Sequence, residues 1–178
     1  NKNNMNTYFY APKEDLYHRL YWKKKYCKKW RSNFRKFTKI CKKNKINIVA
    51  GIAPGLDFNF KQLSESIKKD KKTDFEFLYD KAIQLLNDGA TSIALLLDDI
   101  PDDFQNKFGS QMSEGIYHGM LANKLFKKLG QKIFFVPRIY ADELIKDEPF
   151  YLKDLSKVLN HEIVLFYCGK NVVSESLT

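Results

Sequence analysis

Two adjacent carboxylates, Asp98 and Asp99, follow a continuous apolar run and are the strongest chemical signal in this sequence. The run Ile93–Leu97 is typical of a strand buried on both faces of a parallel sheet, and ligands bind at the carboxyl ends of such strands. Two like charges so close repel, so one carboxyl is expected to keep its proton and act as an acid while the other stays ionised and acts as an orienting base. The alternative is an acidic strand-to-helix loop in which Asp102 or Asp103 caps a turn.

Length and composition predict a folded protein of one domain, residues 1–178. Hydrophobic residues make up 44% of the chain and aromatic residues 15%, which is too apolar for a disordered segment. No apolar run approaches the roughly 20 residues of a membrane helix, and the polar amino terminus does not resemble a signal peptide. Three cysteines without a CxxC pair fit a reducing compartment, so a cytoplasmic location is expected.

The net charge of +10 is concentrated in residues 21–45, which hold ten lysines, two arginines and no acid. Apolar residues recur in this segment at spacings of three and four, which predicts one buried face of a helix. They are Trp22, Tyr26, Trp30, Phe34, Phe37 and Cys41. We expect a solvated outer helix whose aromatic residues are buried while Lys24, Lys28 and Lys42 are exposed. A nucleic-acid-binding surface, with exposed aromatics beside the lysines, is the alternative.

Strand and helix patterns alternate along the whole chain. Strands are predicted at Thr7–Tyr10, Ile46–Ala50, Ser92–Leu97, Lys132–Val136 and Glu162–Tyr167. Besides the basic helix, helices are predicted at Asp74–Asn87, Glu114–Leu129 and Tyr151–Leu159. This alternation predicts an α/β fold with a parallel sheet. Either a doubly wound sheet or part of an eight-stranded barrel fits five such units, but no GxGxxG motif or P-loop follows a strand.

Polar residues follow the carboxyl end of every predicted strand. They are Lys13, Asp57, Asp98 with Asp99, Tyr140 and Cys168. Convergence of residues from several strand ends is how a (β/α)8 barrel forms its site. Because closure needs eight strands, the fold expected here is an incomplete (β/α)8 TIM barrel of about five βα units.

Five segments resemble the signatures of glycoside hydrolase family 84, which contains the O-GlcNAcases and bacterial β-N-acetylglucosaminidases. The family's "YAPKDD…HR" signature is similar to Asn6–Asp15 with Tyr17-His18-Arg19, and its "ISPGLD" segment is similar to Ile52–Asp57. Its "ALLFDDID" segment is similar to Ala94–Ile100. Its "H…N" helix is similar to the segment with His118 and Asn123, and its "TGPKVVS" segment to Gly169 with Val172–Ser174. The order and spacing hold from about residue 5 to residue 175. The resemblance implies barrel strands two to six, with the first strand expected before Asn1 and the family's Trp/Asn/Asp substrate clamp after Thr178.

The resemblance implies a retaining glycosidase in which the 2-acetamido oxygen of the sugar attacks C1 and forms an oxazoline. Asp98 then corresponds to the residue that orients and polarises the acetamido N–H, and Asp99 to the general acid. No metal or cofactor is implied. The expected partner is a glycan or glycoprotein bearing N-acetylglucosamine, and no nucleic acid is expected. An inactive sugar-binding remnant of the same fold is the alternative, and the isolated chain is expected to be nearly inactive.

Other residues correspond to the family's substrate contacts. Lys13 corresponds to a lysine on the sugar hydroxyls, Tyr140 to the tyrosine beside the acetamide, and Cys168 and Val136 to residues of the acetyl pocket. Pro137-Arg138-Ile139 departs from the family's "PTEY" just before Tyr140. The histidines His18 and His118 are expected to pack or cap rather than catalyse.

Overall fold

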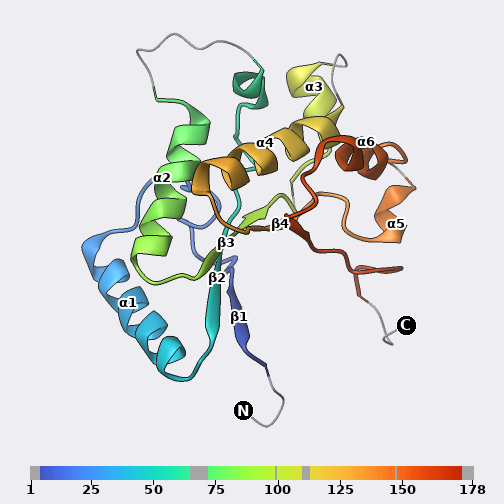
Figure 1. The fold of residues 1–178 in the computed structure, drawn as a ribbon. Coiled ribbons are helices and arrows are strands. Elements are labelled where there is room, and N and C mark those ends of the chain that lie inside the picture. The colour runs from blue at the N-terminus through green and yellow to red at the C-terminus, as the bar shows by residue number, and fades with distance from the viewer. Residues whose placement is uncertain (1–4, 65–71, 99, 110–112, 147, 174–178) are drawn as a thin grey trace.

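A single parallel sheet lies at the centre of the computed structural model, which describes residues 5–64, 72–98, 100–109, 113–146 and 148–173. Within these residues five strands follow each other in sequence order, each parallel to its neighbour (Figure 1). They are β1 (Thr7–Tyr10), β2 (Asn47–Ile52), β3 (Ser92–Leu96), β4 (Phe134–Val136) and β5 (Val164–Leu165). The strand order does not reverse, so the alternative of a doubly wound sheet is wrong.

Helices connect the strands and cover one face of the sheet (Figure 1). The described elements are α1 (Lys28–Lys43), the 3-10 helix η1 (Phe60–Leu63), α2 (Asp74–Asn87), α3 (Phe104–Phe108), α4 (Glu114–Leu129), α5 (Asp142–Ile145) and α6 (Tyr151–Val158). The sequence predicted α2 and α4 with their observed bounds and missed η1, α3 and α5. Across the described ranges, no helix is both long enough and apolar enough to cross a membrane.

Alternate residues of each strand face the two sides of the sheet, as the pleat requires. The outward residues pack against the helices and form the main core; they are Ile48, Ala50, Ile52, Ile93, Leu95, Leu97 and Phe135. The inward residues form a smaller cluster of Val49, Ala53, Ala94 and Leu96 beneath Phe9, Phe134 and Val136. Both faces of the central strands are therefore apolar, as in the helix-covered barrels.

The sheet is strongly curved, because residues of its two edge strands meet on the inner face. In a flat sheet β1 and β5 would lie about 19 Å apart, since neighbouring strands are about 4.8 Å apart. Yet the ring centroids of Phe9 in β1 and Phe166, just after β5, are 5.3 Å apart, and Phe134 lies 5.8 Å from Phe166. The five strands therefore form an arc of a barrel wall.

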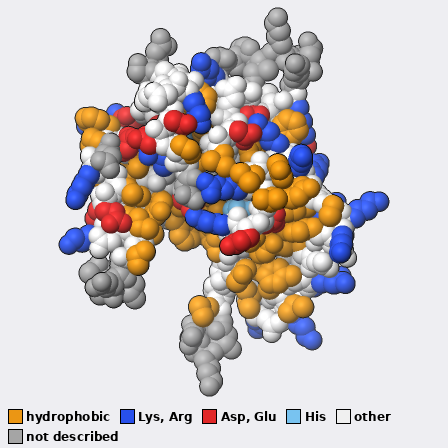
Figure 2. Space-filling model, turned by 180° about the vertical axis from the view of Figure 1, so that it is seen from behind, with side chains coloured by type: hydrophobic (Ala, Val, Ile, Leu, Met, Phe, Trp, Pro, Cys, Tyr) orange, Lys and Arg blue, Asp and Glu red, His pale blue; other side chains and the backbone are white. Residues whose placement is uncertain are grey.

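The inner face of this arc is incompletely covered by the described residues. Phe9 and Phe134 are half-buried, and Phe166 is 41% exposed. In the view opposite to Figure 1, hydrophobic side chains gather over the middle of the molecule, with charged side chains among them (Figure 2). This is the face toward which the interior residues of a barrel point.

The basic segment forms a shorter helix than its spacing predicts. Residues 21–45 were predicted as one helix, but α1 begins only at Lys28 because the preceding residues are fixed by α2. The Gln84 side chain accepts a hydrogen bond from the Tyr26 N–H at 2.8 Å and donates one to its carbonyl at 3.2 Å. The Lys81 ammonium donates to the Lys24 carbonyl at 2.5 Å. These tertiary contacts hold the backbone out of a helix.

Burial along α1 follows the prediction in part. Phe34 is buried, and Lys24, Lys28 and Lys42 are exposed, as predicted. Trp30 and Phe37 are only half-buried, although both pack against the core. Trp22 and Tyr26 are buried from the turns before the helix rather than from its face. The aromatic residues of the segment are thus engaged in packing.

Candidate active site

A cavity of about 140 Å³ lies at the carboxyl ends of the strands, on the inner face of the arc. It is lined by Phe9, Ala11, Lys13, His18, Arg19, Ala53, Leu96, Asp98 and Val136. Parallel strands present their carboxyl ends at one edge of a sheet, which is why residues after β1, β2 and β3 meet the last residue of β4 here. The structure therefore brings together Lys13, Asp98 and Val136, three of the site residues predicted from the sequence.

Asp98 is held beside a cation at this edge. It lies two residues after the end of β3, next to the buried Leu97, and its side chain is 23% exposed. The Lys13 Nζ lies 3.7 Å from Asp98 Oδ2, on a side chain that is 62% exposed. An exposed pair of this length contributes about 0–1 kcal/mol to stability. Such a weak contact is easily exchanged for contacts with a bound ligand.

His18 forms the floor of the cavity next to Asp98. Its ring is 4% exposed, and Nδ1 lies 3.0 Å from the carbonyl oxygen of Gly51. Because a carbonyl oxygen only accepts, Nδ1 carries the proton of the neutral ring. Burial lowers the pKa of His18, so the ring stays neutral. The prediction that His18 packs is confirmed, but its place in the cavity wall was missed; its position after Lys13 in the Tyr-His-Arg segment was the available signal.

Gly51 in β2 leaves the space that this packing needs. A Cβ at this position would lie 2.7 Å from Leu96 Cδ1 and 3.2 Å from His18 Cε1. Both contacts are closer than side-chain carbons normally approach, so any larger residue would displace the cavity wall. The glycine is thus explained by close packing beneath the site.

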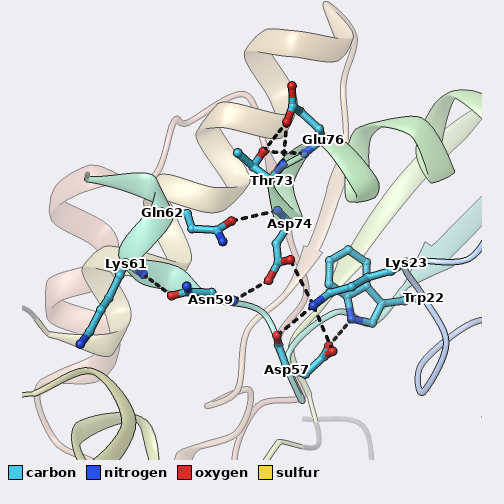
Figure 3. A network of polar contacts seen from close by, with 9 residues as sticks. All are labelled: Trp22, Lys23, Asp57, Asn59, Lys61, Gln62, Thr73, Asp74 and Glu76. Atoms are coloured by element: carbon cyan, nitrogen blue, oxygen red, sulfur yellow. Dashed lines mark hydrogen bonds and ion pairs between the residues drawn. The ribbon is translucent and has the colours of Figure 1, made fainter. Parts of the chain in front are cut away.

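Asp57, which was predicted at the same edge, takes part in a structural network instead (Figure 3). Its carboxylate accepts a hydrogen bond from Trp22 Nε1 at 2.5 Å and lies 3.1 Å from the Lys23 ammonium. Lys23 also lies 3.1 Å from Asp74, whose other oxygen accepts from the Asn59 N–H at 2.8 Å. Asp57 therefore connects the loop after β2 to the start of α2.

Two further predicted residues lie close to each other but away from the cavity wall. Tyr140 follows β4 and is half-buried, and Cys168 follows β5 and is exposed. The Cys168 N–H donates to the Tyr140 carbonyl at 2.7 Å. Among the described residues that line the cavity, neither is present. Asp99, the predicted general acid, lies outside the described residues.

The fold is that of a parallel α/β barrel with acidic and basic side chains at the carboxyl ends of its strands, and the comparison with known families identifies the class of barrel. The family model described as beta-N-acetylglucosaminidase matches residues 1–178. The chain belongs to this family, and its resemblance to glycoside hydrolase family 84 is confirmed. Its fold is an incomplete (β/α)8 TIM barrel of about five βα units.

Individual relatives share this assignment. The chain is 27% identical over 181 residues to Protein O-GlcNAcase of Rattus norvegicus, an alignment that covers 97% of this chain and 19% of the relative. Protein O-GlcNAcase of Mus musculus matches with the same identity and coverage. The chain thus spans about a fifth of the length of these curated relatives.

Solved structures resemble the fold closely. CpGH84B has a TM-score of 0.79 and 27% identity, covering 96% of this chain and 29% of that chain. A mutant of the Thermobaculum terrenum O-GlcNAc hydrolase has a TM-score of 0.80 and 25% identity, covering 99% of this chain and 37% of that chain.

Proposed function

We propose that the protein containing this chain is a retaining β-N-acetylglucosaminidase that removes terminal N-acetylglucosamine from glycoproteins or other glycoconjugates. The observation that supports this most is the position of Asp98 beside Lys13 at the carboxyl edge of the arc, in a member of the beta-N-acetylglucosaminidase family. In sequence a second carboxyl, Asp99, follows directly.

The proposed reaction uses the substrate's own acetamide as nucleophile. The Asp98 carboxylate accepts a hydrogen bond from the acetamido N–H, which increases the electron density on the acetyl oxygen. This oxygen attacks C1 and forms an oxazoline as the N–H proton passes to Asp98, while Asp99 protonates the departing glycosidic oxygen. Asp99 then removes a proton from water, which opens the oxazoline at C1, and Asp98 returns its proton to the acetamide nitrogen. The products are free N-acetylglucosamine with retained configuration and the aglycone alcohol.

The remaining site residues are proposed as substrate contacts. Lys13 exchanges its contact with Asp98 for sugar hydroxyls, and Val136 supplies an apolar wall for the acetyl methyl. Tyr140 and Cys168 are proposed beside the acetamide, which requires the loops after β4 and β5 to contribute to the site once substrate is bound. The proposed catalytic groups thus follow β3, and the proposed substrate contacts come from β4 and from the loops after β1, β4 and β5.

The cavity is a part of the proposed site. Its volume of about 140 Å³ is smaller than the roughly 300–1,000 Å³ typical of small-molecule sites. We propose that residues 1–178 form a single domain that is part of the catalytic barrel, lacking the first strand and the last strands, and that further segments complete the sugar site. O-linked N-acetylglucosamine on serine or threonine is the proposed natural substrate, as the names of the curated relatives suggest.

Hydrolysis by the full-length protein tests this function. We expect turnover of 4-nitrophenyl N-acetyl-β-glucosaminide and of a peptide bearing O-linked N-acetylglucosamine, with the β-anomer as the first product seen by proton NMR. The 4-nitrophenyl glucoside, which lacks the acetamide, is the matched control and should not be cleaved. Sugar binding without turnover would instead identify an inactive remnant of the fold.

A further inference from the structure

Arg138 lies in the loop after β4, two residues from Val136 and two from Tyr140. Its side chain is only 10% exposed and forms a bidentate pair with Glu114 at the start of α4. Nε donates to one Glu114 oxygen at 2.7 Å and Nη2 to the other at 2.5 Å. Paired hydrogen bonds of this kind fix both position and orientation.

The same guanidinium reaches two other loops. Its Nη2 lies 2.8 Å from Glu148 Oε1, just before α6, and 3.7 Å from Asp102 Oδ1. Asp102 belongs to the loop after β3, four residues beyond Asp98. Arg138 is therefore in contact with the loop that carries the proposed catalytic carboxylates, although it lines no part of the cavity at Asp98.

The backbone of Arg138 is also held in place, by one hydrogen bond. Its N–H donates to Tyr151 Oη at 3.1 Å, so the Tyr151 hydroxyl proton is directed to His118 Nδ1 at 2.7 Å. The other His118 nitrogen, Nε2, lies 3.6 Å from Glu114 Oε1 and has no hydrogen-bond partner among the described residues. Arg138, Tyr151, His118 and Glu114 thus form a closed ring in which each residue contacts the next, and Glu114 in turn contacts Arg138.

This ring is buried, so each of its polar groups needs its neighbours in the ring as hydrogen-bond or ion-pair partners. Tyr151 is 3% and His118 0% exposed, and burial lowers the pKa of His118 to about 3, so the imidazole is neutral. Burial raises the pKa of Glu114, and Arg138 opposes that rise. Without Arg138, the Glu114 carboxylate would be left buried with no cation in contact among the residues that the structure describes.

We propose that Arg138 is a positioning residue for the hydrolysis: it fixes the loop after β4 on the base formed by α4 and α6, and a weaker contact with Asp102 orients the loop after β3 relative to it. This inference rests on the proposed function, because the two loops carry Asp98, Asp99 and Tyr140. Arg138 stands where the sequence departs from the pattern of the family. The role is therefore assigned by the contacts in this chain and is not implied by the resemblance.

Kinetics of the full-length protein carrying Arg138→Met and Arg138→Lys test the proposal. Misplacement of catalytic groups by about 1 Å costs on the order of 10²-fold. We expect Arg138→Met to lower kcat by about that factor and to change KM less than about threefold. Arg138→Lys, which keeps the charge and loses the fork, should recover part of kcat.

The matched control is Arg31→Met, which removes another arginine from a buried carboxylate. Arg31 contacts Asp88 at 2.6 and 3.0 Å, at the end of α2 and thus away from the carboxyl ends of the strands. It should lower the Tm and leave kcat unchanged. A merely structural role for Arg138 would make its variants behave in the same way.

Asp102 provides a second, milder test, because its side chain is 69% exposed and its loss does not endanger folding. If Arg138 acts on the loop after β3 through this contact, Asp102→Asn should lower kcat by a few-fold. The effect of Arg138→Met should then be smaller in the Asp102→Asn background than in the wild type. Additive effects would overturn the proposed connection to this loop.

Hydrogen exchange supplies a readout that does not depend on turnover. In Arg138→Met, the amides of residues 100, 102, 103 and 138–141 should exchange at least about tenfold faster, and in Arg31→Met they should not change. A folded Arg138→Met protein with wild-type kcat, or with unchanged exchange in both loops, would refute the positioning role. If the wild type fails to turn over substrate, the proposed function fails, while the exchange result still decides the role of Arg138.

Discussion

Replacement of Asp98 by asparagine should lower the activity of the protein strongly while hardly changing its free energy of unfolding. The substitution hardly changes the side-chain volume and removes one charge. Asp98 has a cationic contact at 3.7 Å, on the largely exposed Lys13. Because exposed pairs of this kind contribute about 0–1 kcal/mol, we expect Asp98→Asn to change the free energy of unfolding by no more than that.

The expected loss of activity is much larger. Removal of a preorganised group that stabilises developing charge lowers kcat by about 10²–10³-fold, which is about 2.7–4 kcal/mol. In the proposed reaction Asp98 assists the attack on C1 and does not contact the leaving oxygen. Its loss should therefore slow substrates with good and poor leaving groups by the same factor.

The assay is a plot of log kcat/KM against leaving-group pKa for a series of aryl N-acetyl-β-glucosaminides. For Asp98→Asn the line should move down without a change of slope. Asp99→Asn should instead steepen the slope, because general acid help of about 10²–10⁴-fold is lost only where the leaving oxygen needs a proton. Equal slopes for the two variants would refute this division of roles. It would also be refuted if Asp98→Asn lost activity only because the protein unfolds.

Three further predictions concern His118, Gly51 and Thr73. His118 has a pKa of about 3 in the folded protein and near 6.5 in the unfolded chain, so the free energy of unfolding falls as the pH drops from 6.5 toward 3. In urea unfolding of His118→Gln, the free energy of unfolding should depend less on pH in this range, by up to about 1.4 kcal/mol per pH unit. Gly51→Ala should lower the free energy of unfolding by about 1–3 kcal/mol and raise KM, because the new Cβ would lie 2.7 Å from Leu96 Cδ1 in the cavity wall; an unchanged KM would contradict this. Thr73→Ala should lower the free energy of unfolding by about 1 kcal/mol without changing kcat, because Thr73 forms a capping box with Glu76 at the start of α2.

Local signals in the sequence account for most of the fold. β3 and α4 could be located because an apolar run and a glycine-terminated periodic segment have few competing interpretations. The basic helix was predicted seven residues too early, because its start depends on hydrogen bonds from Gln84 in α2, 58 residues away. No local pattern in the segment itself indicates such a contact.

The site residues, too, fall into those that local sequence signals place and those that depend on distant contacts. Lys13 and Asp98 could be placed at one edge because each follows a parallel strand, and strand direction determines this position; Val136, the last residue of β4, was placed there by the family resemblance. Arg138 could not be recognised as important, since its partners are 24 residues before it, 10 after it and 36 before it. Cys168 was predicted in the acetyl pocket from the family resemblance, but it is exposed, because its place depends on how the loop after β5 folds back toward β4.

The central claim, that the substrate's acetamide is the nucleophile, is tested most directly by weakening that nucleophile. The full-length protein should be given 4-nitrophenyl β-glucosaminides with acetyl, fluoroacetyl, difluoroacetyl and trifluoroacetyl groups on nitrogen. Because each fluorine withdraws electron density from the attacking oxygen, kcat/KM should fall steeply and steadily along the series. A kcat/KM that does not depend on fluorination would show that another group attacks C1, and the account given for Asp98 would be wrong.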